Sequence, residues 1–191
     1  MMEKKGFIRY KYIGKLLLQM MNDVTRKAVV VGAGPAGLLM AHYLLARNYQ
    51  VEIYDRRSDP RLVDLESRRS FPISLQERGR QALQGIPGLE AAITTHSVFC
   101  KGTMIHSKKG ARDIKRQNEV MTIDRNQLVL SILEHLVAQY DAPELTLRFD
   151  CMCDRVDDEE QTLHLKTTAG DDVSVRYDRL IGADGARSEV R

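Results

Sequence analysis

The sequence has few of the residues and patterns that identify several large classes of protein. Its 191 residues include only three cysteines, Cys100, Cys151 and Cys153, an odd number and too few for a disulfide framework. This usage is typical of a reducing compartment, and we expect a cytoplasmic protein. The pair Cys151-x-Cys153 lacks the second ligand pair of a zinc site, and the five histidines show no metal-ligand spacing. We therefore expect no metal, and we predict that both cysteines pack on the same face of one strand.

The chain also lacks a strong excess of one charge and a long apolar run. Its formal net charge is +3, and its basic clusters are short and scattered, so we expect no nucleic-acid partner. No stretch reaches the roughly 20 apolar residues of a transmembrane helix. Residues 1–25 contain Leu16-Leu17-Leu18 behind a basic patch but no small-residue cleavage site. We interpret them as an N-terminal extension, either a frayed segment or the product of a start codon assigned upstream of Met20 or Met21.

A glycine motif in a strand–turn–helix context is the most informative feature present. The chain is long enough for one domain with a real core, and its hydrophobic content of 43% is ordinary for a globular protein. Gly32-x-Gly34-x-x-Gly37 follows the apolar run Val29–Val31 and opens a helix with an apolar stripe. A second predicted strand, Gln50–Tyr54, ends at Asp55. This arrangement predicts a dinucleotide-binding βαβ unit in an α/β fold.

Each position of this motif has a physical role. Gly32 permits the sharp turn, Gly34 lets a pyrophosphate approach the backbone, and Gly37 lets the helix pack tightly on the sheet. The unpaired amides and the positive dipole end of the helix then face the phosphates. Asp55, about 20 residues further on, is expected to accept hydrogen bonds from a ribose hydroxyl.

The remaining elements follow from periodicity and turn residues. We interpret residues 56–70 as a loop, and Asp124 as the cap of a helix that ends near Tyr140. Two further helices are expected over 76–83 and up to Thr95, with a break at Gly85–Gly88. Strands are predicted at 71–75, 97–107, 111–116, 119–123, 145–149, 151–156, 162–167, 173–177 and 179–182.

Three motifs in this order carry a family resemblance: the glycine fingerprint, the helix start Asp124–Leu128, and Ile181-Gly-Ala-Asp-Gly-Ala-Arg-Ser188. Together they resemble the FAD-binding part of the flavin-dependent aromatic hydroxylases, the p-hydroxybenzoate hydroxylase class. Within that class, residues 70–83 and 104–107 are most similar to the kynurenine 3-monooxygenase family. The resemblance implies a GR2-type Rossmann-like FAD-binding domain over 26–191, incomplete at its end, in which residues 97–123 contribute strands to a substrate-side sheet.

The resemblance also implies roles for single residues around the adenosine half of FAD. Pro35 and Ala36 would lie against the pyrophosphate. The adenosine ribose would be surrounded by Tyr54, Asp55, Arg56 and Arg57.

Further implied contacts come from more distant parts of the chain. Ser74 would lie near the flavin side of the cofactor, and Arg125 would reach the cofactor with its guanidinium fork. Cys153 would lie on a third parallel strand whose backbone faces the adenine. Asp184 and Gly185 would serve both FAD and reduced nicotinamide. The residues alone leave open that Arg125 is a surface arginine and that Asp184-Gly185 is an ordinary turn.

By the same resemblance, the protein is an FAD- and NAD(P)H-dependent monooxygenase. NADPH or NADH would reduce the flavin, and molecular oxygen would then form a flavin hydroperoxide that hydroxylates a small aromatic substrate. The protein would bind, orient and exclude water, so no catalytic side chain is assigned. Two alternatives stay open: another flavoprotein of this fold (a quinol-precursor hydroxylase, isoprenoid reductase or halogenase), or a non-catalytic FAD-binding fragment.

Two departures from the kynurenine enzymes concern the substrate and the length. An arginine and a tyrosine that hold the substrate carboxylate in that family are replaced here by Thr103 and Gln117, although Lys101 is close enough to supply a charge. The later Gly-Asp motif of the family is absent, and Ser188–Arg191 resembles the first turn of an unfinished helix. We therefore expect a fragment, and a substrate that is kynurenine-like or another aromatic ring.

Overall fold

A four-stranded parallel sheet forms the centre of the molecule. The computed structural model describes residues 26–64, 69–186, 188 and 190. The sheet has the order β10-β1-β2-β6, in which every neighbouring pair is parallel. Its strands are β1 (Lys27–Val31), β2 (Gln50–Tyr54), β6 (Leu145–Arg148) and β10 (Arg179–Gly182). The predicted α/β fold with a Rossmann-like βαβ unit is confirmed.

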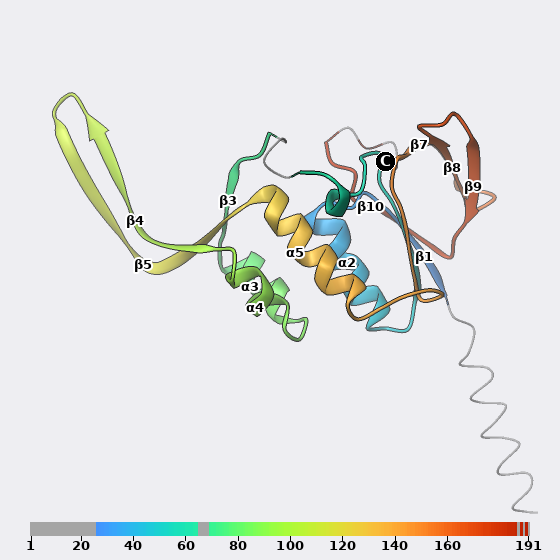
Figure 1. Cartoon of the computed structure of the whole chain (residues 1–191), viewed down its shortest axis with the longest axis horizontal. Coiled ribbons are helices and arrows are strands. Elements are labelled where there is room, and N and C mark those ends of the chain that lie inside the picture. The colour runs from blue at the N-terminus through green and yellow to red at the C-terminus, as the bar shows by residue number, and fades with distance from the viewer. Residues whose placement is uncertain (1–25, 65–68, 187, 189, 191) are drawn as a thin grey trace, which may run out of the picture.

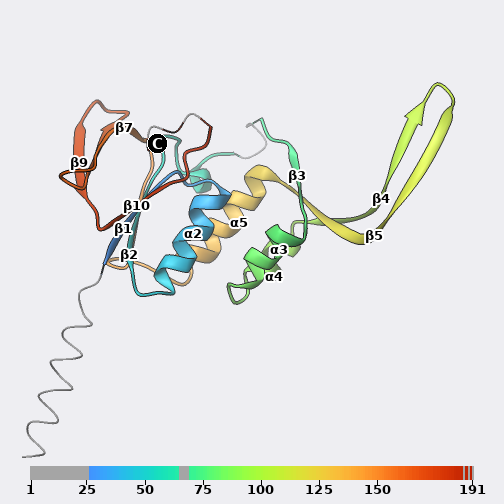
Figure 2. The same ribbon diagram turned by 180° about the vertical axis from the view of Figure 1, so that it is seen from behind.

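The apolar run in β1 is buried on both faces of this sheet. Because side chains alternate along a strand, Ala28 and Val30 enter one core while Val29 and Val31 enter another. The first core lies beneath α2 (Pro35–Leu45) and α5 (Arg125–Val137), which run side by side in Figures 1 and 2. A continuous β-branched run is thus what a strand between two layers requires.

An antiparallel sheet covers the second face. It has the order β7-β8-β9, with β7 (Cys151–Asp157), β8 (Thr162–Thr167) and β9 (Asp172–Arg176). Cys151 and Cys153 are both buried in the core between this sheet and Val29 and Val31. The prediction that they pack on one face of a strand is confirmed.

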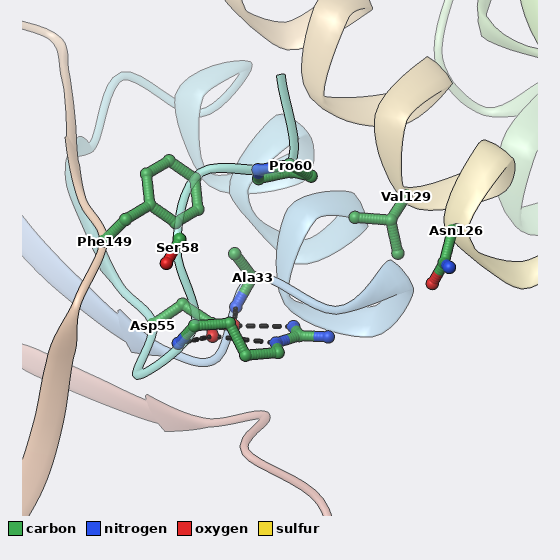
Figure 3. Close-up of a pocket in the computed structure, with 8 residues that line it drawn as sticks. Ala33, Asp55, Ser58, Pro60, Asn126, Val129 and Phe149 are labelled. Atoms are coloured by element: carbon green, nitrogen blue, oxygen red, sulfur yellow. Dashed lines mark hydrogen bonds and ion pairs between the residues drawn. The ribbon is translucent and has the colours of Figure 1, made fainter. Parts of the chain in front are cut away.

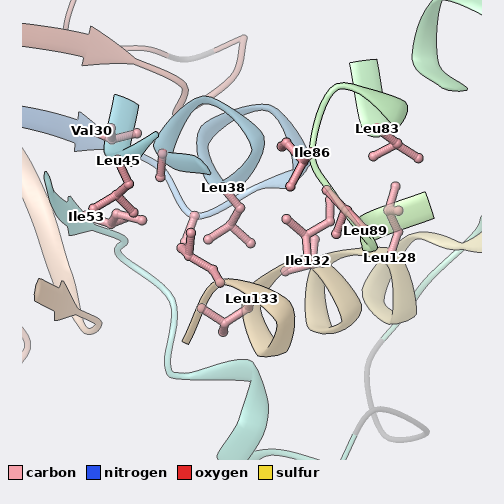
Figure 4. Close-up of a cluster of buried hydrophobic side chains, with 14 of the residues drawn as sticks. Val30, Leu38, Leu45, Ile53, Leu83, Ile86, Leu89, Leu128, Ile132 and Leu133 are labelled. Carbon is pink, nitrogen blue, oxygen red and sulfur yellow. The ribbon is translucent and has the colours of Figure 1, made fainter. Parts of the chain in front are cut away.

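Two short helices extend the helical core. They are α3 (Glu77–Gln84) and α4 (Leu89–Thr94), separated by a break at Gly85–Gly88 as predicted. Figure 4 shows Leu83, Ile86 and Leu89 from this segment next to Leu128 and Ile132 of α5. Helices α3, α4 and α5 therefore share one apolar core.

A long hairpin projects from this body (Figures 1 and 2). It consists of β4 (Val98–Ser107) and β5 (Gly110–Asp124), and β3 (Pro72–Leu75) pairs with the base of β5 in a sheet of order β3-β5-β4. The prediction of two separate strands at 111–116 and 119–123 is wrong, because β5 runs through both. Cys100 pairs with Val120 and Gly102 with Lys115, so residues 116–119 bulge opposite Lys101.

The other differences from the sequence predictions are small. The stretch 56–70 is predicted as a loop, and its described residues, 56–64 and 69–70, include a 3₁₀ turn, η1 (Pro60–Leu62). The predicted extension 1–25 lies outside the described residues, as do Glu189 and Arg191 of the helical turn predicted at Ser188–Arg191. Within the described part of the chain, no helix combines the length and apolar character needed to cross a bilayer.

Candidate functional site

A cleft lies where three parallel strands end at the same edge of the central sheet. Its volume is about 560 Å³, within the range of roughly 300–1,000 Å³ that is usual for small-molecule sites. In open α/β sheets this edge is where ligands bind. The residues that line it lie at or just after the ends of β1, β2 and β10, or belong to β7 and the start of α5: Val31, Gly32, Gly34, Tyr54, Asp55, Arg56, Arg57, Arg125, Cys151, Met152, Cys153, Asp154, Ala183, Asp184 and Gly185.

The three glycines of the turn are glycines for different reasons. Gly32 has a φ of +107°, and a Cβ there would collide with the carbonyl oxygen of Ala183. A Cβ at Gly37 would collide with the carbonyl oxygen of Gly32. Gly34 has an ordinary φ of −78°, and a Cβ there would meet no atom within 4 Å. Gly32 and Gly37 are therefore required by the fold, whereas Gly34 keeps open space in front of the backbone.

The N-terminus of α2 borders this open space. Gly34 is its N-cap and makes no side-chain cap, and Pro35 occupies the first helical position, where its missing N–H is tolerated. First-turn amides have no partner within a helix, and the helix dipole adds positive charge there. This end of α2 is thus suited to an anion such as a phosphate.

Asp55 connects the glycine turn to the end of β2. Its side chain is 5% exposed. One carboxylate oxygen, Oδ2, accepts hydrogen bonds from the Ala33 amide at 2.6 Å and from Arg57 Nη2 at 2.7 Å. The other, Oδ1, accepts from the Arg57 amide at 2.8 Å and from Arg57 Nε at 2.9 Å. Figure 3 shows Asp55 and Ala33 with these bonds as dashed lines.

These contacts fix the charge state of Asp55. Burial on its own would raise the pKa of the carboxyl group, but the hydrogen bonds and the charge of Arg57, together with the Ala33 amide, lower it below its usual value. The carboxylate is therefore ionised at neutral pH. Tyr54, the last residue of β2, differs: burial raises the pKa of its phenol, and the hydrogen bond to Glu52 Oε2 at 2.8 Å raises it further. Tyr54 thus stays neutral.

Most of the predicted cofactor-binding residues come together in this cleft. Its lining includes Gly32, Gly34, Tyr54, Asp55, Arg56, Arg57, Arg125, Cys153, Asp184 and Gly185. Pro35 and Ala36 lie in the first turn of α2 beside it, and Gly37 packs against the turn. Ser74 is not among the lining residues; it lies on β3, with its hydroxyl 3.2 Å from Thr122 Oγ1. The geometry leaves the role of each residue a prediction.

The predicted position of Cys153 in the fold is wrong. We expected it on a third parallel strand, but it lies on β7 of the antiparallel sheet, and the parallel neighbour of β2 is β6. The chain turns sharply after β6 and crosses to the other face at Asp150, whose φ is +57°. The sequence pattern of residues 145–156 predicts two strands, but the periodicity of apolar residues alone does not indicate which of the two joins the parallel sheet.

Sequence reasoning also missed residues that line the cleft. These are Val31, Cys151, Met152, Asp154 and Ala183. Val31 and Ala183 directly precede the glycine turn and the Asp-Gly motif, so their position at strand ends was a usable signal. Met152 and Asp154 had no such signal, because only the path of β7 across the sheet brings them to this edge.

The cleft fits a dinucleotide cofactor such as FAD. Gly34 leaves room for a diphosphate against the backbone, the α2 terminus supplies amide donors, and Arg56 and Arg125 supply positive charge. The buried carboxylate of Asp55 stands beside this space, where a ribose would follow the diphosphate.

Comparison with known proteins supports this interpretation. Residues 30–63 match the family model of the NAD(P)-binding Rossmann-like domain. The chain is 34% identical over 184 residues to a kynurenine 3-monooxygenase of Stenotrophomonas maltophilia, and 36% identical over 179 residues to one of Salinispora arenicola. Each alignment covers 90% of this chain and 38% of the relative. The predicted similarity to kynurenine 3-monooxygenases is confirmed, and the chain spans well under half of their length.

Solved structures show the same fold. The tetrameric form of 2-methyl-3-hydroxypyridine-5-carboxylic acid oxygenase superposes with a TM-score of 0.70 at 21% identity, over 88% of this chain and 42% of that one. The flavin-dependent monooxygenase PieE, solved with FAD and substrate, gives a TM-score of 0.72 at 21% identity, over 88% of this chain and 31% of that one. The predicted flavin-monooxygenase fold is confirmed.

Proposed function

We propose that this chain is the FAD-binding part of an FAD-dependent aromatic monooxygenase. The observation that carries the proposal is the cleft at the ends of β1, β2 and β10, where the glycine turn, Asp55 and Asp184-Gly185 converge. The similarity to kynurenine 3-monooxygenases over 90% of the chain supports the same assignment.

In this proposal the chain binds and orients the adenosine diphosphate half of FAD. The diphosphate lies against Gly34 and the first turn of α2, with Arg56 and Arg125 compensating its charge. Asp55 accepts hydrogen bonds from the ribose, and Asp184 with Gly185 contacts the cofactor from the end of β10. When bound, FAD would supply the redox chemistry: it would accept a hydride from NADPH or NADH and would react with molecular oxygen.

The substrate proposed is a small aromatic compound of the kynurenine type. The sheet β3-β5-β4, including residues 97–123, would form the start of the substrate-side sheet. Thr103 and Gln117 replace the charged clamp of the kynurenine enzymes. Lys101 and Gln117 line one groove at the bulge of the hairpin, where Lys101 Nζ lies 3.4 Å from Glu119 Oε1. This groove supports Lys101 as the residue that meets an anionic group of the substrate.

The test of the proposal is cofactor retention followed by turnover. Purified chain incubated with FAD should keep a flavin spectrum after desalting, and Gly34→Val should lose it. Ala46→Val, at the opposite and exposed end of α2, is the matched control and should retain the flavin. Oxidation of NADPH or NADH that accelerates on addition of kynurenine or a phenolic acid supports the monooxygenase. A folded chain that retains no flavin contradicts the proposal.

A further inference from the structure

We propose that Arg57 competes with the ribose of the cofactor for Asp55, and that its side chain leaves the carboxylate when adenosine binds. This inference rests on the proposed function and adds a specificity-determining residue to it. In the structure, Asp55 accepts four hydrogen bonds, two on each oxygen. A carboxylate has about four lone-pair positions, so Asp55 has no acceptor position left for a ribose hydroxyl.

The four bonds divide into two that are fixed and two that can be released. The amides of Ala33 and Arg57 belong to the backbone of the glycine turn and of the chain leaving β2. The bonds from Nε and Nη2 of Arg57 come from a side chain. If the guanidinium moves away, each oxygen gains one acceptor position while the Ala33 bond still holds the turn.

Burial and location make the guanidinium the mobile partner. The Asp55 side chain is 5% exposed, whereas that of Arg57 is 41% exposed. Arg57 also lines the cleft. Because the Arg57 side chain is already partly exposed, water screens its ion pair and hydrates the guanidinium once it leaves, so its exchange for ribose hydroxyls is feasible. Two ribose hydroxyls would restore the number of bonds that Asp55 accepts.

The competition can be measured as a ratio of two affinities. We would titrate ADP and 2′,3′-dideoxy-ADP into the wild-type chain and into Arg57→Met, which lacks donors and charge. Both ligands carry the same phosphates, so the loss of charge at residue 57 cancels in the ratio of their dissociation constants. In the wild type, part of the ribose contribution is offset by release of Arg57. In Arg57→Met no side chain has to be released, so the ribose contribution is not offset. The preference for ADP over 2′,3′-dideoxy-ADP should therefore rise about tenfold, as expected for a hydrogen bond to a charged group.

Two further variants make the outcome unambiguous. Arg176→Met removes an exposed arginine of β9 that does not line the cleft, and it should keep the wild-type ratio. Arg57→Lys keeps the charge but cannot form the two-pronged bond, so its ratio should also rise; it carries the comparison if Arg57→Met fails to fold. An identical ratio in the wild type and in the folded Arg57 variants would overturn the competition. Absence of ADP binding in every folded variant would instead overturn the proposed function.

Discussion

The glycines of the turn differ in their roles: some are required for folding and one is available for cofactor binding. Gly32 and Gly37 are each pressed against backbone atoms, whereas Gly34 faces open space. The sequence motif does not distinguish these roles, because all three positions are simply glycine. The distinction depends on how closely β10 and α2 approach the turn.

A pair of alanine substitutions tests this distinction. Gly37→Ala should lower the free energy of unfolding by more than about 2 kcal/mol, because the new methyl group must displace the Gly32 carbonyl. Gly34→Ala should lower it by about 1 kcal/mol or less, because alanine is a poorer N-cap than glycine, and it should still weaken FAD binding. Urea denaturation and FAD titration measure the two effects. An equal loss of stability in both variants would contradict the assignment.

His42 is a buried titratable residue away from the cleft. Its ring is 2% exposed, between α2 and α5, with Nε2 3.4 Å from the Ile132 carbonyl oxygen and its centroid 5.1 Å from that of His135. The pKa of His42 is lowered from 6.5 to about 4: burial is the largest cause, the hydrogen bond with the Ile132 carbonyl opposes it, and the charge of His135 adds to it. His42 is therefore neutral in the folded chain at neutral pH.

The pH dependence of stability follows from this pKa. Between pH 6.5 and about 4 the unfolded chain protonates His42 and the folded chain does not, so the free energy of unfolding falls as the pH falls through this window. The loss should approach about 3 kcal/mol at the acid end. Urea denaturation at several pH values should show a flatter profile for His42→Leu and an unchanged one for the exposed His106→Gln. A wild-type profile that stays level to pH 4 would contradict the prediction.

Among the elements, α5 begins at a cap that the sequence identifies. The Asp124 carboxylate accepts hydrogen bonds from the amides of Asn126 at 2.8 Å and Gln127 at 3.2 Å. The same residue ends β5, so the cap joins the hairpin to the helix that carries Arg125.

Substitution of the cap should destabilise the chain locally. Asp124→Ala should lower the free energy of unfolding by about 1 kcal/mol, because two amides of the first turn lose their acceptor. Asp124→Asn retains an acceptor oxygen and should stay within a few tenths of a kcal/mol of the wild type. Denaturant titration of both variants checks this, and equal losses would show that charge rather than capping dominates.

The elements that the sequence predicted are those whose signals are local. The strand–turn–helix unit of residues 27–54 and the cap at Asp124 depend on neighbours in sequence, and both are confirmed. The continuity of β5 and the sheet to which Cys153 belongs depend on pairing with distant segments. The bonds between Arg57 and Asp55 depend on the backbone turn after β2, which the sequence does not encode as a recognisable pattern.

Across the whole molecule, stability resides in the body and not in the hairpin. Leu133 of α5 is fully buried, whereas Ile105 near the hairpin tip is about half exposed. Leu133→Ala should cost about 2–5 kcal/mol of unfolding free energy, and Ile105→Ala less than about 1 kcal/mol. Thermal or urea denaturation of the two variants provides the comparison. A large loss for Ile105→Ala would show that the hairpin belongs to the stabilising core.

The central claim is that the cleft at the carboxyl ends of β1, β2 and β10 holds the adenosine diphosphate half of FAD. Isothermal titration calorimetry of FAD and of ADP into the folded, cofactor-free chain tests it most directly. We predict heat from both ligands at one site, with ADP displaced by FAD and both signals lost in Gly34→Val. A chain that is folded by circular dichroism and releases no heat with either ligand would contradict the account.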